Sequence, residues 1–114
     1  MSILLSLALA GCAKHAPSNA ADYVGAWEDE GGSVTTIDKS GRALEVTSII
    51  DTDGEVFEVK GTGYVGGQLN WTYLVPSTGY VVTIRVLSLE GDQLCATWEN
   101  AYDHGNECYT RVSW

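Results

Sequence analysis

The chain has 114 residues, of which 15 are acidic and six are basic, and its formal net charge is −9 at pH 7 with histidine counted as neutral. This acidic balance excludes nucleic acid as an expected partner, because phosphate backbones attract proteins rich in Lys and Arg. The length suits one small domain plus a short extension, and a core of this size gains from a covalent cross-link.

The chain begins with a short apolar leader. Ile3–Ala10 is far shorter than the ~20 residues that a membrane-spanning helix needs, so it is expected to be a targeting segment. The stretch Leu9-Ala10-Gly11-Cys12 resembles the lipobox of bacterial lipoproteins, in which a signal peptidase cuts before the cysteine and the cysteine is acylated. The resemblance implies a signal peptide over residues 1–11 and lipidation of Cys12.

Residues 12–22 have linker composition, with Pro17 among small and polar residues, and are expected to tether a domain to the membrane. Ala13, rather than aspartate, follows Cys12. By the lipoprotein sorting pattern this implies an outer membrane of a bacterial cell envelope, with the domain facing the periplasm. The membrane is then a partner through the acyl chains on Cys12, since two or more chains hold a protein stably.

From residue 23 onward, apolar residues recur with a period of two rather than 3.6. In Gln68–Val75, for example, Leu69, Trp71, Tyr73 and Val75 share one face. Turn signals recur roughly every 8 to 12 residues. The pattern predicts one domain over 23–114, with strands at 23–29, 33–38, 43–50, 55–61, 67–75, 80–89, 93–99 and 107–113.

Two of these turn signals are Gly61-Thr62-Gly63 and Asp103-His104-Gly105-Asn106. No stretch shows helical periodicity. Short strands joined by short turns, with an even strand count, predict an all-β fold: a small eight-stranded antiparallel up-and-down barrel.

The chain has three cysteines, one near the N-terminus and two near the C-terminus. With Cys12 lipidated, Cys95 and Cys108 remain as a pair in an oxidising compartment, which favours a disulfide. A metal-binding pair is the alternative, although no second Cys or His cluster stands at ligand spacing. If Cys95 lies opposite Cys108, the disulfide faces outward while Tyr109 and Arg111 face inward.

Gly25 and Trp27 on the first expected strand, together with Arg111 on the last, resemble the lipocalin and wider calycin pattern. In that pattern the tryptophan plugs the closed end of an antiparallel barrel and the arginine packs across it. The resemblance implies that Gly25, Trp27 and Arg111 form a barrel plug at the end that carries the tether. Asp92, expected opposite Arg111, would neutralise its charge.

Successive hairpins of a meander alternate between the two ends, so the acidic loops gather at the end away from the tether. We expect an acidic rim there, whose negative potential favours cations; a role in solubility alone is the other interpretation. The residues of this rim are Asp51, Asp53, Glu55, Asp103, His104 and Glu107.

The interior aromatic residues are candidates for a ligand pocket. They are Trp71, Tyr73, Tyr80 and Trp98. An eight-stranded barrel is just wide enough to be filled by side chains or to hold one small ligand. These rings therefore either fill the core or line a small pocket.

Catalytic and metal sites are not expected. Asp51-Thr52-Asp53-Gly54-Glu55 looks like the start of a calcium loop, but Val56 and Thr62 stand where an EF-hand needs glycine and glutamate, so a hairpin turn is expected. His104 beside Asp103 has no nucleophile to activate. We expect no enzyme activity, no cofactor and no metal.

Three functions remain. The first is a lipid-anchored envelope barrel that binds a small apolar or cationic ligand at its acidic open end. The second is a protein-interaction module, since Gly63-Tyr64-Val65-Gly66-Gly67 with Trp71 resembles a loop pattern of the periplasmic lysozyme-inhibitor lipoproteins, which implies a basic protein as partner. The third is a structural envelope lipoprotein with a filled barrel.

Overall fold

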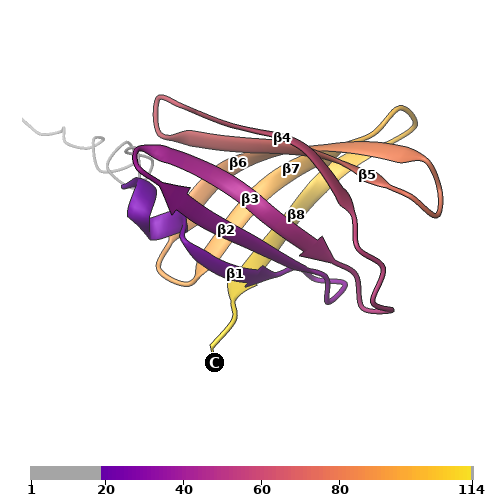
Figure 1. Cartoon of the computed structure of the whole chain (residues 1–114), viewed down its shortest axis with the longest axis horizontal. Helices are drawn as coiled ribbons and strands as arrows, with labels where there is room; N and C mark the ends of the chain where they lie inside the picture. Colours follow the sequence, from indigo (N-terminus) through magenta and orange to yellow (C-terminus); the bar gives the residue numbers. More distant parts are fainter. Residues whose placement is uncertain (1–18, 114) are drawn as a thin grey trace, which may run out of the picture.

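A computed structural model describes residues 19–113, so the expected signal peptide and Cys12 lie outside the described residues. Figure 1 shows a short 3-10 turn followed by a meander of strands. The elements are η2 (Ala20–Tyr23), β1 (Gly25–Glu28), β2 (Val34–Ser40), β3 (Ala43–Ile50), β4 (Glu58–Val65), β5 (Gln68–Val75), β6 (Tyr80–Glu90), β7 (Gln93–Glu99) and β8 (His104–Arg111).

The eight strands form one antiparallel sheet in the order β3-β2-β1-β8-β7-β6-β5-β4. Strand β1 pairs with β8, so the two ends of the domain meet, and the sheet curls until β3 and β4 approach each other. An isolated bridge between Ile50 and Val56 joins these two edges. The predicted all-β, eight-stranded antiparallel barrel is confirmed, and it is nearly closed, with a seam between β3 and β4.

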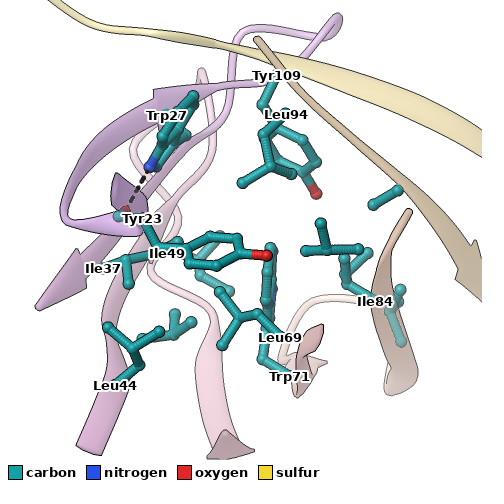
Figure 2. Close-up of a cluster of buried hydrophobic side chains, with 14 residues drawn as sticks. Tyr23, Trp27, Ile37, Leu44, Ile49, Leu69, Trp71, Ile84, Leu94 and Tyr109 are labelled. Carbon is teal, nitrogen blue, oxygen red and sulfur yellow. Dashed lines mark hydrogen bonds between the residues drawn. The ribbon is translucent and has the colours of Figure 1, made fainter. Parts of the chain in front are cut away.

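The core is one cluster of inward-facing side chains, part of which Figure 2 shows. It follows from the period of two: in β5, Leu69 and Trp71 are buried while Gln68 is exposed. The fully buried large side chains are Trp27, Trp71, Ile37, Leu69, Ile84 and Leu94. They come from β1, β2, β5, β6 and β7, so the interior is filled from both walls of the barrel.

The predicted disulfide between Cys95 and Cys108 is confirmed. The two residues lie directly opposite each other in the β7–β8 ladder, and Leu94 lies opposite Tyr109. Because Leu94 and Tyr109 are buried, the alternation of the strands places the disulfide on the outer face.

The turn expected at Gly61-Thr62-Gly63 is wrong, because β4 continues to Val65. The chain reverses at Gly66 and Gly67 instead, both of which have positive φ. Gly63 is a strand residue, and a Cβ there would lie 2.9 Å from Asn70 Oδ1, so the Asn70 side chain would have to shift.

The turn expected at residues 103–106 also lies earlier, since β8 begins at His104. The chain turns at Asn100–Asp103, where Asn100 Oδ1 accepts the N–H groups of Tyr102 and Asp103, both at 2.8 Å. Gly105 is a strand residue covered by the Trp98 indole, whose Nε1 would lie 2.9 Å from an added Cβ. Glycine thus marks close packing here, not a turn.

The start of the domain differs as well. Residues 20–22, expected in the tether, belong to η2, and Tyr23, expected in the first strand, ends that turn. The buried Tyr23 donates a hydrogen bond to the Gly67 carbonyl at 3.1 Å, and its ring meets the edge of Tyr64 at 5.8 Å between centroids. The turn therefore ties the N-terminal side of the barrel to the β4–β5 hairpin.

Candidate functional site

One end of the barrel is closed by Trp27. Its side chain is 1% exposed, and Nε1 donates to the Tyr23 carbonyl at 2.9 Å (Figure 2). The Arg111 guanidinium carbon lies 4.3 Å from the centre of the Trp27 ring, which is a cation–π distance. Arg111 Nε also donates to Asp92 Oδ1 at 2.9 Å, so the inward cation is neutralised.

Gly25 makes room for this arrangement. Its φ is +141°, and an added Cβ would lie 2.9 Å from Arg111 Nη1. Arg111 donates from Nη1 to the Val24 carbonyl at 2.7 Å and from Nη2 to the Asp22 carbonyl at 2.9 Å. All three guanidinium nitrogens therefore have acceptors in the fold, and this end is structural.

Glu107 lies near the opposite end, which we call the mouth. It stands opposite Ala96, which is buried, so the alternation of β8 turns Glu107 toward the interior. The Tyr109 hydroxyl donates to Glu107 Oε2 at 3.3 Å. The expectation that Glu107 belongs to the exposed rim therefore has to be corrected: the side chain is half-buried and faces inward.

Burial raises the pKa of Glu107 to about 7, and repulsion from Asp29 and Glu30 adds to the rise, while the hydrogen bond from Tyr109 opposes it. Burial also raises the pKa of Asp29, although the N–H groups of Ser33 and Gly31 donate to its carboxylate, both at 2.9 Å. Two partly desolvated acids thus lie close enough to repel each other at the mouth.

No basic side chain of residues 19–113 forms an ion pair with Glu107 or Asp29. The three ion pairs of that range are Lys60–Glu58, Arg85–Glu99 and Arg111–Asp92. In the second of these pairs, Arg85 of β6 donates to Glu99 at the end of β7. Glu107 and Asp29 therefore have no ion-pair partner among the described residues.

Aromatic rings accompany these acids. Tyr73 is stacked on Phe57, with centroids 5.3 Å apart and an interplanar angle of 6°. Burial raises the pKa of Tyr73, and the charges of Glu107, Asp29 and Asp51 raise it further, so this phenol keeps its proton beside the acids. Phe57 lies in the strand predicted at 55–61 but was not singled out as a site residue; the structure places it between the Ile50–Val56 bridge and the start of β4.

The four aromatic candidates do not form one pocket. Trp71 is 1% exposed and belongs to the core. Tyr80 is 45% exposed and contacts Tyr102, with ring centroids 5.6 Å apart. Trp98 lines a hollow of about 480 Å³ along the β7–β8 hairpin. By strand alternation, Tyr73, Tyr80 and Trp98 all lie on the inward face of the sheet. They are spread between the core and the mouth instead of lining one pocket.

The indole N–H group of Trp71 is unusual. Its Nε1 is buried and has no hydrogen-bond acceptor among the described residues. The ring meets the edge of Tyr109 at 6.0 Å between centroids, and Tyr109 in turn donates to Glu107. Buried N–H groups are rarely left without an acceptor. The core below the mouth therefore contains one hydrogen-bond donor, Trp71 Nε1, without an acceptor among the described residues.

The carboxyl groups of the rim loop between β3 and β4 lie close together. Asp51, Asp53 and Glu55 each offer an oxygen within 4.8 Å of the others. These oxygens already organise the loop: Asp51 accepts from the Ser33 hydroxyl at 2.7 Å, which lowers the pKa of Asp51, and Asp53 accepts from the Glu55 N–H at 2.9 Å. Glu55 accepts from the Ser77 N–H and hydroxyl.

Asp103 and His104 stand on the exposed β7–β8 hairpin. Asp103 Oδ1 accepts the backbone N–H of His104 at 2.8 Å, so the acid shapes the turn. Within residues 19–113, neither Asp103 nor His104 forms a hydrogen bond with a serine or a cysteine.

The chain matches no protein-family model, and no curated protein or solved structure is significantly similar to it. Within residues 19–113, no helix is long and apolar enough to cross a bilayer.

Proposed function

We propose that this protein is a lipid-anchored binding barrel of the bacterial cell envelope that takes a small organic cation with an apolar or aromatic body at its mouth. The observation that carries the proposal is Glu107, an inward, half-buried carboxyl group that has no basic partner among residues 19–113. Strongly shifted titratable groups in concave regions are typical of functional sites.

A bound cation would relieve the electrostatic cost of this arrangement. Ionised Glu107 and Asp29 repel each other in a partly desolvated place, and such charges are disfavoured unless they are paired. A ligand cation would pair with them, while the stacked rings of Tyr73 and Phe57 would contact its apolar body. Aromatic rings also attract quaternary ammonium groups directly, through the cation–π interaction.

The proposed anchor is compatible with this site. The tether would enter through η2, which packs on Trp27 at the closed end, and the mouth lies at the other end of the strands (Figure 1). With Cys12 acylated, the mouth would therefore point away from the membrane. We do not assign a catalytic residue or a cofactor to this function.

A protein-interaction module of the lysozyme-inhibitor type is the second candidate. Tyr102 favours it, because this ring is 81% exposed at the tip of a hairpin whose turn is fixed by the hydrogen bonds to Asn100. Exposed, preorganised tyrosines are frequent contact residues at protein interfaces. A basic protein would be the partner on this acidic end.

The experiment that tests the proposal is calorimetric titration of the full chain with quaternary ammonium probes: choline, tetraethylammonium and benzyltrimethylammonium. Each is compared with its uncharged analogue, in which carbon replaces nitrogen. We expect at least one cation to bind more tightly than its analogue. Because the probe charge is fixed, affinity should rise about tenfold from about pH 6 to about pH 8 as Glu107 ionises around a pKa of about 7.

The matched variants are Glu107→Gln, which should remove the pH dependence and most of the preference for the cation, and Asp53→Asn on the exposed rim, which should not. If no probe binds, or if cation and analogue bind equally, the proposal fails. Binding of a basic protein that is lost in Tyr102→Ala but kept in Glu107→Gln would favour the second candidate.

A further inference from the structure

Strand β1 is too short to cover the whole length of β8. The two strands pair at two positions only, Trp27 with Arg111 and Glu28 with Thr110. Strand β8, however, already begins at His104. Among residues 19–113, the part of β8 on the mouth side of Thr110 therefore has no strand beside it on the side of β1.

The side chain of Glu30 replaces the missing strand at one point. If the β1–β8 register continued, residue 30 would lie opposite Cys108. The backbone turns away before it reaches that position, but Glu30 Oε2 accepts the Cys108 N–H at 3.1 Å. No other hydrogen bond joins residues 29–33 to β8 in the region that the structure describes.

Residues 29–33 form the β1–β2 turn, which carries Asp29. The Asp29 N–H donates to the Ser33 carbonyl at 2.9 Å, and the Asp29 carbonyl accepts the Gly32 N–H at 3.0 Å. The Asp29 carboxylate accepts the N–H groups of Gly31 and Ser33 in the same turn. The turn therefore sets the direction of the Asp29 side chain, and the contacts of the turn set its distance from Glu107.

On its other side, the turn contacts the loop between β3 and β4. The Ser33 hydroxyl donates to Asp51 Oδ1 at 2.7 Å. Gly32 has a φ of +93°, and an added Cβ would lie 2.5 Å from Thr52 Cγ2, so the turn and the loop approach closely. Of these contacts, only the hydrogen bond from Cys108 to Glu30 joins the turn to the strand that carries Glu107.

The partner of Glu30 is fixed in position. Cys108 follows Glu107 in β8 and is cross-linked to Cys95. Glu107 lies opposite Ala96, with its side chain turned inward. The hydrogen bond of Glu30 therefore attaches the turn directly beside Glu107, at a point that the disulfide holds in register.

We propose that Glu30 is a positioning residue of the mouth, which accepts the Cys108 N–H and thereby holds Asp29 beside Glu107. The inference rests on the proposed function, in which Asp29 and Glu107 pair with a ligand cation. Glu30 is exposed and acts through its acceptor oxygen. Glutamine, which keeps that oxygen, should therefore preserve its role, whereas alanine should abolish it.

The first test needs no ligand and compares the wild type with Glu30→Gln and Glu30→Ala. The Cys108 amide should exchange its hydrogen at least about tenfold faster in Glu30→Ala than in Glu30→Gln, because only the alanine variant lacks the acceptor. Both variants should fold as the wild type does, which circular dichroism can verify.

The pKa of Glu107 reports the position of the turn in the same variants. Glu107 is faced by Asp29 and Glu30 from the turn, by Tyr73 from β5 and by Tyr109 from β8. Burial raises the pKa of both tyrosines, so they stay uncharged. Glu30→Gln removes one repelling charge and should lower the pKa of Glu107 below about 7. Glu30→Ala should lower it further, by about half a unit, because Asp29 also moves away.

The second test is titration of the full-length variants with benzyltrimethylammonium at about pH 8. Glu30→Gln should bind within about threefold of the wild type, since an exposed charge contributes little. Glu30→Ala should bind at least about tenfold more weakly, because the cation then meets one carboxylate instead of two. The matched control is Glu28→Ala, which removes an exposed charge without a side-chain hydrogen bond in the described structure and should bind as the wild type does.

The outcomes separate this inference from the proposed function. The inference is overturned if Glu30→Ala and Glu30→Gln give the same Cys108 exchange rate and the same pKa of Glu107, or if Glu30→Ala binds the cation as tightly as the wild type. If no cation binds the wild type, the proposed function fails, whereas the exchange rates and the pKa values still decide whether Glu30 holds Asp29 beside Glu107.

Discussion

Glu107 combines a structural cost with the binding role that we propose for it. Its inward direction follows from its place opposite buried Ala96, and its environment contains Asp29 and Glu30 but no basic residue of the described chain. The protonated carboxyl is favoured in the folded state, because burial disfavours the charge. The residue therefore opposes folding when it is ionised and attracts a cation for the same reason.

Glu107→Gln should stabilise the protein in a pH-dependent way. The pKa in the folded state is about 7, raised from 4.5, so the wild type loses stability as the pH rises from about 4.5 through about 7. The substitution should raise the free energy of unfolding at about pH 8 by about 1 to 2 kcal/mol, a value reduced for solvent screening, and change it little at about pH 4. Urea denaturation at the two pH values measures this, and an equal effect at both would contradict the assignment.

Gly25→Ala should destabilise the closed end. The new methyl group would meet Arg111 Nη1 at 2.9 Å with φ at +141°, so strain and displacement of the guanidinium add up to about 2 to 3 kcal/mol. Gly41→Ala is the matched control, because its φ is +61° but nothing lies within 4 Å. It should cost only about 1 kcal/mol. Thermal unfolding compares the two, and similar losses would mean that the contact with Arg111 is unimportant.

At the scale of the elements, the β7–β8 hairpin is held by a disulfide as well as by its ladder. The disulfide and the ladder from Gln93–Thr110 to Glu99–His104 hold it in register, and its tip presents Tyr102. The hairpin also provides Arg111 to the closed end and Glu107 to the mouth. Loss of the cross-link should therefore affect both ends of the barrel.

Replacement of Cys95 and Cys108 by alanine should lower the free energy of unfolding by about 3 kcal/mol, because the bridge closes a loop with a sequence separation of 13. Denaturant unfolding of the oxidised wild type and of the double variant gives this value. The reduced wild type serves as control and should resemble the double variant. A loss below about 1 kcal/mol would show that the ladder alone holds the hairpin.

Strand identity could be predicted from the sequence, whereas strand ends could not. Alternation in Gln68–Val75 and the facing cysteines are local signals, so β5 and the β7–β8 register were correct. Gly63 and Gly105 were misinterpreted as turn residues, because glycine occurs both in turns and where a neighbouring side chain lies close to the backbone, and the two uses look alike in the sequence. The late start expected for β8 in turn placed Glu107 on the rim instead of inside the mouth.

At the scale of the whole molecule, the features that could not be predicted depend on how the sheet closes. The seam exists because β3 and β4, which are neighbours in the chain, are joined by a loop with one bridge instead of a tight hairpin. The approach of Asp29, Tyr73 and Glu107 likewise needs the curl that brings β1, β5 and β8 around one mouth. Such contacts are set by long-range packing, which a period of two does not encode.

Cys12→Ser should release the protein from membranes without changing its thermal stability, since the expected anchor precedes the described domain. Fractionation of cells that express the wild type and the variant measures this. Cys95→Ala is a suitable control, because it removes a cysteine of the fold and should leave the protein with the membrane. A Cys12→Ser protein that still sediments with membranes would exclude the lipobox interpretation.

The central claim is that the mouth is an acidic site that a ligand cation completes, and the pKa of Glu107 reports it directly. A carboxyl-detected NMR titration of the full chain, without and with saturating benzyltrimethylammonium, measures that pKa. We predict a value of about 7 for the protein alone and a lower value with the cation, because binding favours the ionised carboxylate. A Glu107 that titrates near 4.5 in the free protein, or whose pKa does not change with the cation, would contradict the account.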